Sequence, residues 1–452
     1  MIIIQNGQLV SPTGLTRADL AMDEGRIVSI APHLAPGPQD TVYDAQGCYV
    51  FPGFIDGHTH LDMDSGVTVT ADDFATGSRA AVCGGTTTLV DFATQDKGGT
   101  LMQALDAWHK KAEGRCSCNY AFHMAITDWN PAVKEEIPLM FQEGVSSFKA
   151  YMAYDALKVN DAQLLEMLET IGPMGGILGV HCENGLLVNT LQAQQKAMGH
   201  FGPDGHPASR PPEVEAEAVN RLCYLGKLAD APVHVVHLSS ALGLEEVRAA
   251  RKNGVTVYAE TCPQYLVLDE SRYKTPGFEG AKYVMSPPLR SPADVQALRQ
   301  AVINGEIDTI ATDHCSYNFK GQKELGLTDF TKIPNGGPGI EHRPMVVYSS
   351  MVDTGELAVT DFCRLLAEGP ARLFGMYPQK GVLAVGSDAD ITIWDPTAKT
   401  TIRAARQHQN VDYTPYEGFS ITGMPRYVFV GGTLAAQDGQ PTEALAGRYV
   451  KR

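Results

Sequence analysis

Two histidines one residue apart, His58 and His60, stand in the stretch FPGFIDGHTHLDM, residues 51–63. The residues before them form an apolar run typical of a buried strand. Because alternate residues of an extended strand share one face, both imidazoles are expected to point to the same side. Two imidazoles on one face are suited to binding a metal ion. The stretch therefore predicts part of a metal site, and further ligands must come from elsewhere in the chain.

Four more side chains that can bind a metal or react follow apolar runs further along the chain. They are Lys149 in FKAYMAY, His181 in VHCEN, His237 in VHLSS and Asp313 in ATDHC. Four imidazoles and one carboxylate suit Zn²⁺ or a similar borderline metal. A lone histidine is more often a structural residue than a ligand, so the prediction for His181 and His237 depends on all these side chains meeting at one place.

Lys149 stands apart in this set, because a protonated ammonium would repel a divalent cation. A deprotonated lysine can react with carbon dioxide to form a carbamate, an anion whose two oxygens can bridge two metals. Two metals about 3.5–4 Å apart can share a water, lower its pKa towards roughly 7 and polarise a carbonyl. The alternative is a surface lysine that points away. The sequence thus predicts a two-metal hydrolytic centre, provided that Lys149 faces the histidines.

The elements that must bring these side chains together are eight apolar runs between residues 51 and 316. Helical stretches such as LMQALDAWHKKAEG and SPADVQALRQAVING separate the runs, as expected of β/α units in a parallel sheet. Eight such units predict an α/β fold with a (β/α)8 TIM-like barrel, whose active site lies at the C-terminal ends of the strands. The runs are FPGFIDGHTH, TTTLVDFAT, NYAFHMAIT, SSFKAYMAY, GGILGVHCEN, APVHVVHLSS, VTVYAETCP and DTIATDHCS.

Both ends of the chain contain short strand-like pieces with turns between them, for example ADLAMDEGRIVSIA and PRYVFVGGTLAAQDG. We predict that residues 1–50 and 380–452 pair into one small β-sandwich domain, and that residues 51–379 form the barrel. The segment from about Phe319 to Arg343 is rich in glycine and proline. We expect it to be a long loop that forms a lid or a pocket wall.

Charge and composition exclude several kinds of partner. The chain has 36 basic and 52 acidic residues, a formal net charge of −16 and no basic cluster mixed with aromatic residues, so we expect no nucleic acid to bind. No apolar stretch reaches about 18 residues, and MIIIQNGQLV is typical of a strand and not of a signal peptide. Nine scattered cysteines predict reduced, packed thiols. We therefore expect a cytoplasmic protein with no membrane partner.

Taken together, the motifs resemble the dihydropyrimidinase and hydantoinase branch of the amidohydrolase superfamily, and phenylhydantoinases in particular. The resemblance extends over nearly the whole chain. One H-x-H motif is weakly specific, whereas its occurrence in order with the other motifs is highly specific. The resemblance implies hydrolytic opening of a cyclic amide, a 5-substituted hydantoin or a dihydropyrimidine, to an N-carbamoyl amino acid. The other motifs are FKAYMAY, VHCEN, VHLSS, ETCPQYL, SPPLR, ATDHC and IPNGGPG.

The resemblance also implies which residues hold two divalent metals, which are zinc or, as alternatives, manganese or cobalt. A hydroxide is implied to bridge them, and Asp313 to carry its proton to the leaving nitrogen. The implied ligands are His58, His60, Asp313 and the Lys149 carbamate for one metal, and the same carbamate with His181 and His237 for the other.

Three substrate contacts follow from the resemblance as well. Tyr154 is implied to stabilise the tetrahedral oxyanion through its hydroxyl, and the backbone at Ser286 and Asn335 to pair with the ring amide. Without the family, Tyr154 is an aromatic residue near a strand end, and the other two are turn residues. The resemblance also implies a homotetramer.

Related enzymes share the barrel and much of the ligand set, so the metal site does not name the substrate. In dihydroorotases an arginine two residues after the second histidine grips the substrate carboxylate. Here that position is Asp62, which favours a neutral ring. Allantoinase or another cyclic amidohydrolase is the enzymatic alternative. The non-enzyme alternative is a metal-free interaction protein like the collapsin response mediators, although all six ligand positions are filled here. An aminohydrolase acting on an exocyclic amine would use one metal and need no Lys149.

The ring substituent is expected to point towards the loops that follow the first, second and fourth strands of the barrel. An apolar lining there would favour bulky apolar substituents by burying them. The alternative is that these side chains only pack the loops. The predicted lining consists of Met63, Val67, Phe92, Tyr151 and Leu157.

Overall fold

The computed structural model describes residues 1–452, and eight parallel strands form the sheet at its centre. The strands pair in chain order, and nearly all their residues are buried, which explains why they read as apolar runs. A parallel bridge between Thr59 and His314 brings the two edges together. This confirms the predicted TIM-like barrel. Its strands are β8 (Phe54–Thr59), β9 (Thr86–Thr94), β10 (Asn119–Ala125), β11 (Ser147–Tyr151), β12 (Ile177–His181), β13 (Val233–Val235), β14 (Val257–Thr261) and β15 (Thr309–Ile310).

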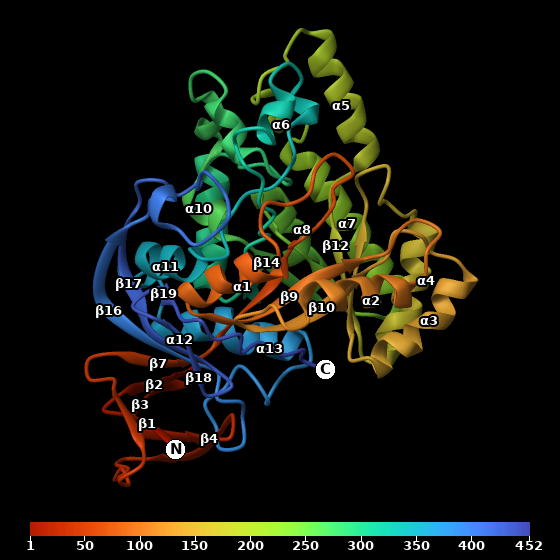
Figure 1. The fold of residues 1–452 in the computed structure, drawn as a ribbon. Helices are drawn as coiled ribbons and strands as arrows, with labels where there is room; N and C mark the ends of the chain where they lie inside the picture. Colours follow the sequence, from red (N-terminus) through yellow and green to blue (C-terminus); the bar gives the residue numbers. More distant parts are fainter.

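Helices follow the barrel strands and cover the outside of the sheet (Figure 1). Capping boxes fix where several begin, such as Asp73 with Thr76 and Ser291 with Asp294. None of the helices is both long and apolar enough to span a bilayer. Their bounds are α1 (Phe74–Cys83), α2 (Leu101–Ala112), α3 (Pro131–Gln142), α4 (Asp161–Ile171), α5 (Gly185–Ala197), α6 (Gly205–Ala208), α7 (Pro212–Ala229), α8 (Ala241–Lys252), α9 (Pro263–Val267), α10 (Pro292–Ile303), α11 (Arg343–Val347), α12 (Val359–Cys363) and α13 (Gly369–Leu373).

A second, smaller domain combines both ends of the chain, as predicted. In Figure 1 the red N-terminal strands lie beside the blue C-terminal strands. One sheet has the order β19-β18-β17-β16-β7-β2-β3 and the other the order β5-β4-β1-β6. A separate apolar cluster that includes Ile4, Leu20, Val50 and Ile391 forms its core. The strands are β1 (Ile2–Gln5), β2 (Gln8–Ser11), β3 (Gly14–Arg17), β4 (Asp19–Asp23), β5 (Arg26–Ala31), β6 (Thr41–Asp44), β7 (Tyr49–Pro52), β16 (Ile391–Thr401), β17 (Ser420–Val430), β18 (Thr433–Gln437) and β19 (Gln440–Pro441).

The chain passes between the two parts at points that differ slightly from the predicted ones. The run FPGFIDGHTH is two strands, because β7 pairs with β16 through Pro52 and only β8 belongs to the barrel. At the other end, Tyr120 on β10 accepts a backbone hydrogen bond from Val450 and donates one to Arg448. The last residues of the chain therefore pack on the barrel.

The long segment after β15 contains short 3₁₀ turns, η4 (Lys323–Gly326) and η5 (Phe330–Lys332), and no strand. Residues from this segment are nevertheless buried, including Lys323, Phe330 and Ile333. The loop is therefore a packed part of the protein that covers the C-terminal side of the barrel next to the predicted site.

Candidate active site

The barrel brings the six predicted ligand residues to one region at the C-terminal ends of its strands. Strand register explains part of this convergence, because Lys149 pairs with Gly179 and Tyr151 pairs with His181 on the neighbouring strand. The six positions are His58 within β8, His60 directly after it, Lys149 within β11, His181 at the end of β12, His237 two residues beyond β13 and Asp313 three residues beyond β15.

His58, His60 and Asp313 form the first of two groups of potential metal ligands. Asp313 Oδ1 lies 3.2 Å from His58 Nε2 and 3.3 Å from His60 Nε2. The ligand atoms of the three residues all lie within 4.8 Å of one another. His58 Nε2 is buried and makes no hydrogen bond. A buried nitrogen without a partner is costly unless something else satisfies it, so this group fits a metal ion.

His181 and His237 form the second group. His181 Nδ1 and His237 Nε2 are 2.9 Å apart, and His237 Nδ1 is buried without a partner. The rings of His58 and His237 lie 5.4 Å apart between centroids, which brings the two groups next to each other. Burial lowers the pKa of His58, His181 and His237, so these imidazoles are neutral, the form that binds metals.

Lys149 lies among these histidines and has no partner of its own. It is 1% exposed, and its Nζ makes no hydrogen bond or ion pair with another side chain; the aromatic rings of Phe92 and Tyr151 lie 5.1 and 5.4 Å from it. Burial lowers its pKa to about 8, against the opposing charge of Asp313. The Phe92 ring beside its Nζ in turn packs against His58 at 4.6 Å and His60 at 4.9 Å between centroids. The lysine therefore faces the histidines, and the surface alternative is wrong.

Comparison with known proteins identifies the family. Residues 49–435 match the model of the amidohydrolase family. The chain belongs to the amidohydrolase family. It is 45% identical to the D-hydantoinase of Geobacillus stearothermophilus and 43% identical to that of Ralstonia pickettii, over 100% of this chain and 96% and 98% of theirs. The crystal structure of dihydropyrimidinase from Brevibacillus agri NCHU1002 superposes with a TM-score of 0.98 at 45% identity, over 100% of this chain and 98% of that one.

These likenesses place the amidohydrolase in the hydantoinase branch, as the sequence motifs predicted, and make it a cyclic amidohydrolase. The family has a divalent metal centre, and the cluster of His58, His60 and Asp313 is suited to one. The reading of the chain as a metal-free interaction protein is not supported.

Two buried glutamates that sequence reasoning did not single out orient the histidines of this amidohydrolase. Glu260 Oε1 lies 2.7 Å from His58 Nδ1, and Glu183 Oε2 lies 2.7 Å from His181 Nε2. Each contact leaves the other ring nitrogen to face the site, as carboxylates do for metal-binding histidines. The signal was present for Glu183, because it stands two residues after His181 in VHCEN.

Arg210 connects one of these glutamates to the predicted oxyanion residue. It forms a buried ion pair with Glu183, and its guanidinium carbon lies 5.5 Å from the centre of the Tyr154 ring. Burial alone would raise the pKa of Glu183, but the Arg210 and His181 partners lower it to about 2. Burial raises the pKa of Tyr154, so its hydroxyl stays protonated and can donate a hydrogen bond. The Tyr154 ring lies 5.2 Å from the His181 ring.

Several residues of the site have an unusual backbone. Tyr154, His237 and Asp313 have φ angles of 67°, 39° and 53°, in the left-handed region that non-glycine residues rarely adopt. Asp62 also lies there, at 50°. Such conformations cost on the order of 1–3 kcal/mol each and gather at functional sites. They turn these side chains towards the centre just beyond the strand ends.

The predicted substrate contacts and pocket residues lie around this centre at different depths. Tyr151 and Phe92 form a small apolar cluster with Ala125, and Tyr154 and Leu157 pack against it. Ser286 is buried and its Oγ has no hydrogen-bond partner, while Asn335 and Met63 are half-buried. Val67 is 65% exposed, so any contact with substrate must come from the edge of the pocket.

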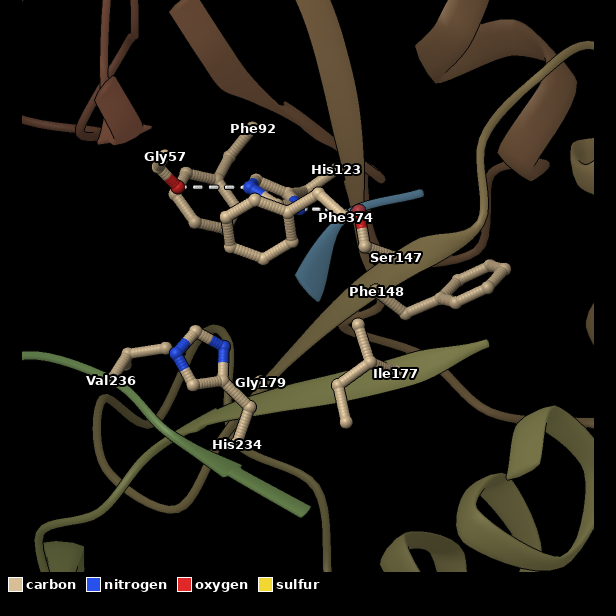
Figure 2. Close-up of a pocket in the computed structure, with 10 residues that line it drawn as sticks. All are labelled: Gly57, Phe92, His123, Ser147, Phe148, Ile177, Gly179, His234, Val236 and Phe374. Carbon is tan, nitrogen blue, oxygen red and sulfur yellow. Dashed lines mark hydrogen bonds between the residues drawn. The ribbon is translucent and has the colours of Figure 1, made fainter. Parts of the chain in front are cut away.

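Phe92 packs against the predicted ligand histidines His58 and His60. Its ring stacks on His60 at 4.9 Å and on His123 at 4.7 Å. Figure 2 shows Phe92 at the wall of a narrow internal cavity, where His123 is hydrogen-bonded to Gly57 O and Ser147 Oγ. The contacts of Phe92 support a packing role beneath the ligands beside its predicted role in the pocket.

Proposed function

We propose that this cyclic amidohydrolase opens the ring of a 5-substituted hydantoin or a dihydropyrimidine to give an N-carbamoyl amino acid. The observation that carries the proposal is Lys149, a fully buried lysine without a partner among four histidines and Asp313. Reaction of its neutral amine with carbon dioxide gives a carbamate and releases one proton. This converts the one unsuited group of the site into an anionic ligand.

The site would hold two divalent metals, zinc or, alternatively, manganese or cobalt. When bound, the metals would supply a nucleophilic water at neutral pH and polarise the scissile carbonyl. The unpartnered nitrogens of His58 and His237 support this assignment. One metal would take His58, His60, Asp313 and the Lys149 carbamate, and the other the same carbamate with His181 and His237.

The remaining steps are the work of the chain's own side chains and backbone. Asp313 would accept the proton of the attacking water and deliver it to the leaving ring nitrogen. The Tyr154 hydroxyl would donate a hydrogen bond to the oxygen that gains charge as the carbonyl becomes tetrahedral. The backbone at Ser286 and Asn335 would pair with the ring amide and hold the scissile bond in place.

The ring is proposed to be neutral and of the D configuration. Asp62 is half-buried beside the site and would repel a carboxylate on the substrate, as in dihydroorotate. The names of the two curated relatives, both D-hydantoinases, support the D enantiomer. The apolar cluster around Tyr151 supports an apolar substituent.

The decisive experiment compares hydrolysis of phenylhydantoin, dihydrouracil, allantoin and dihydroorotate by the metal-loaded enzyme. We expect turnover of the first two, with the D enantiomer of phenylhydantoin preferred, and little or none of dihydroorotate. Allantoin as the best substrate would favour the allantoinase alternative, and dihydroorotate as the best substrate would contradict the argument from Asp62.

We also propose a homotetramer in the cytoplasm. Exposed leucines on α5 and α7, Leu186 at 70% and Leu228 at 72%, are the apolar side chains that subunit contacts would cover. All nine cysteines are free and buried, which suits a reducing compartment. Light scattering should give the mass of four chains of 48.7 kDa.

A further inference from the structure

Lys323, in the loop after β15, is a fully buried cation without an acidic partner. It is 0% exposed, and the hydrogen-bond acceptors of its Nζ are carbonyl oxygens, none of them a carboxylate. Burial lowers its pKa to about 7, while three surrounding carbonyl oxygens favour the protonated form. Its Nζ donates three hydrogen bonds, all to backbone carbonyls, at 2.7 Å to Val284, 2.6 Å to Pro334 and 2.7 Å to Gly336. A charge is costly to bury, so a lysine at this place needs an explanation beyond filling space.

The three carbonyls belong to the two segments that carry the proposed ring-amide contacts. Val284 lies two residues before Ser286, and Pro334 and Gly336 lie on either side of Asn335. The segments are far apart in sequence, and one direct backbone hydrogen bond, from Gly336 N to Val284 O at 3.1 Å, also joins them. The ammonium of Lys323 therefore donates hydrogen bonds to both segments and links them to each other.

The chemistry of lysine suits this task better than that of any other cation. An ammonium is a compact charge with three donors, and here each donor has one carbonyl. The guanidinium of arginine is a planar fork that cannot direct three hydrogen bonds from a single atom. Gly336 lets its segment pack closely, because a Cβ at this position would lie 2.3 Å from the carbonyl oxygen of Cys315.

We propose that Lys323 is a positioning residue for substrate recognition. It fixes the spacing between segments 284–286 and 334–336, so that the backbone of Ser286 and the backbone of Asn335 engage the ring amide together. This inference rests on the proposed function of those two residues. Lys323 contacts none of the metal ligands, so its effect should be on substrate binding and not on metal content.

The test compares Lys323→Met with the matched control Lys332→Met, an exposed lysine of the same loop. Both metal-loaded enzymes are assayed for metal content and for KM and kcat on dihydrouracil and phenylhydantoin. We expect full metal content in both variants. For Lys323→Met we expect a KM about tenfold higher, which corresponds to the loss of roughly one to two backbone hydrogen bonds to the substrate. KM should rise more than kcat falls. The factor should be the same for both rings, because both share the amide that the segments bind.

Hydrogen–deuterium exchange without substrate gives a readout that does not depend on the reaction. Peptides covering 284–290 and 333–339 should exchange faster in Lys323→Met than in the wild type or Lys332→Met. Unchanged KM and unchanged exchange in the folded variant would overturn the inference. A different result is possible if the wild-type enzyme opens no ring. Faster exchange in Lys323→Met would then still support the role of Lys323 in joining the two segments, while the proposed function would be rejected.

A second variant covers the case in which Lys323→Met does not fold. Lys323→Arg keeps the charge and most of the volume but cannot satisfy three carbonyls from one atom. It should also show a raised KM at full metal content. A KM equal to that of the wild type in Lys323→Arg would show that any buried cation suffices and would overturn the proposal.

Discussion

The proposed metal-ligand side of the active site is carried by barrel strands, whereas the proposed ring-amide side is carried by the loops that follow β14 and β15. On the ligand side, the atoms proposed to bind metal belong to side chains such as His58, Lys149 and His181. The barrel strands bring these side chains together. On the amide side, the atoms proposed to bind the substrate belong to the backbone at Ser286 and Asn335. The ligand side can therefore be recognised from residue types in the sequence. The amide side depends on where the fold places backbone groups, which every residue has.

The two sides also differ in how buried charge is stabilised. Near the ligands, the buried carboxylate of Glu183 pairs with the guanidinium of Arg210. On the amide side, one ammonium is held by three carbonyl oxygens and no carboxylate. Changes on the ligand side should thus affect metal content and turnover, and changes on the amide side should affect substrate binding. The following variants test that division.

The largest effect is expected for Lys149→Ala. Loss of the proposed carbamate would remove a ligand from both proposed metals, so metal content and turnover should fall together, turnover to background. Short carboxylic acids should restore part of both by replacing the missing bridge. Metal analysis and hydrolysis rates measured side by side check this, with the exposed Lys134→Ala as control. Full metal content with unchanged turnover would defeat the two-metal proposal.

Asp313→Asn should separate turnover from metal binding. The amide keeps an oxygen near His58 and His60 but cannot carry a proton, so we expect most of the metal to remain. Turnover should fall by about 10²–10⁴, the range for general acid–base groups. If kcat stays within a few-fold of the wild type at full metal content, another residue moves the proton.

Glu183→Gln should weaken the ligand side indirectly. The amide no longer fixes the His181 ring by a charged contact, and metal affinity should fall by about 10–100-fold, as measured by titration with a chelator. The exposed Glu245→Gln is the matched control. Unchanged metal affinity in a folded Glu183→Gln variant would show that the His181 ring is oriented by other contacts.

The pH dependence of stability in the metal-free Glu183→Gln variant tests the ion pair between Glu183 and Arg210. The pKa of Glu183 is about 2 in the folded chain and about 4.3 when exposed, so its carboxylate stabilises the fold above about pH 4.3. This stabilisation is lost as the pH falls towards 2. The gap in unfolding free energy between wild type and Glu183→Gln should therefore narrow over that range. A gap that does not change with pH would contradict the ion pair.

Much of the ligand side could be predicted because buried strands can be recognised in the sequence as short apolar runs. The run TTTLVDFAT coincides with β9, in which every residue but the last is buried, and its apolar centre marks a strand covered on both faces. The six ligand candidates lie in or just beyond the C-terminal halves of the strands, where a barrel brings side chains together. Distances and partners, such as Glu260 across from His58, depend on neighbouring strands and could not be inferred from one strand alone.

The amide side was accessible only through family resemblance, for a physical reason. Lys323 stands in GQKELG, a polar stretch typical of an exposed loop, yet it is fully buried. Its partners are carbonyl groups, which every residue has, so no residue type marks them. Likewise, Val67 fits an apolar lining by type, but its side chain is mostly exposed. Loops without periodicity give no signal of which face is buried.

The smallest effects are expected at the substituent pocket, where Met63→Ala and Leu157→Ala shorten two half-buried side chains. Neither residue is a proposed metal ligand, so metal content should be unchanged in both. Each truncation removes apolar surface that a phenyl ring could cover, at roughly 25 cal/mol per Å², and dihydrouracil has no such ring. The ratio of phenylhydantoin to dihydrouracil turnover should therefore fall a few-fold. Lys323→Met, in contrast, should leave that ratio unchanged, and an unchanged ratio in both pocket variants would place the substituent elsewhere.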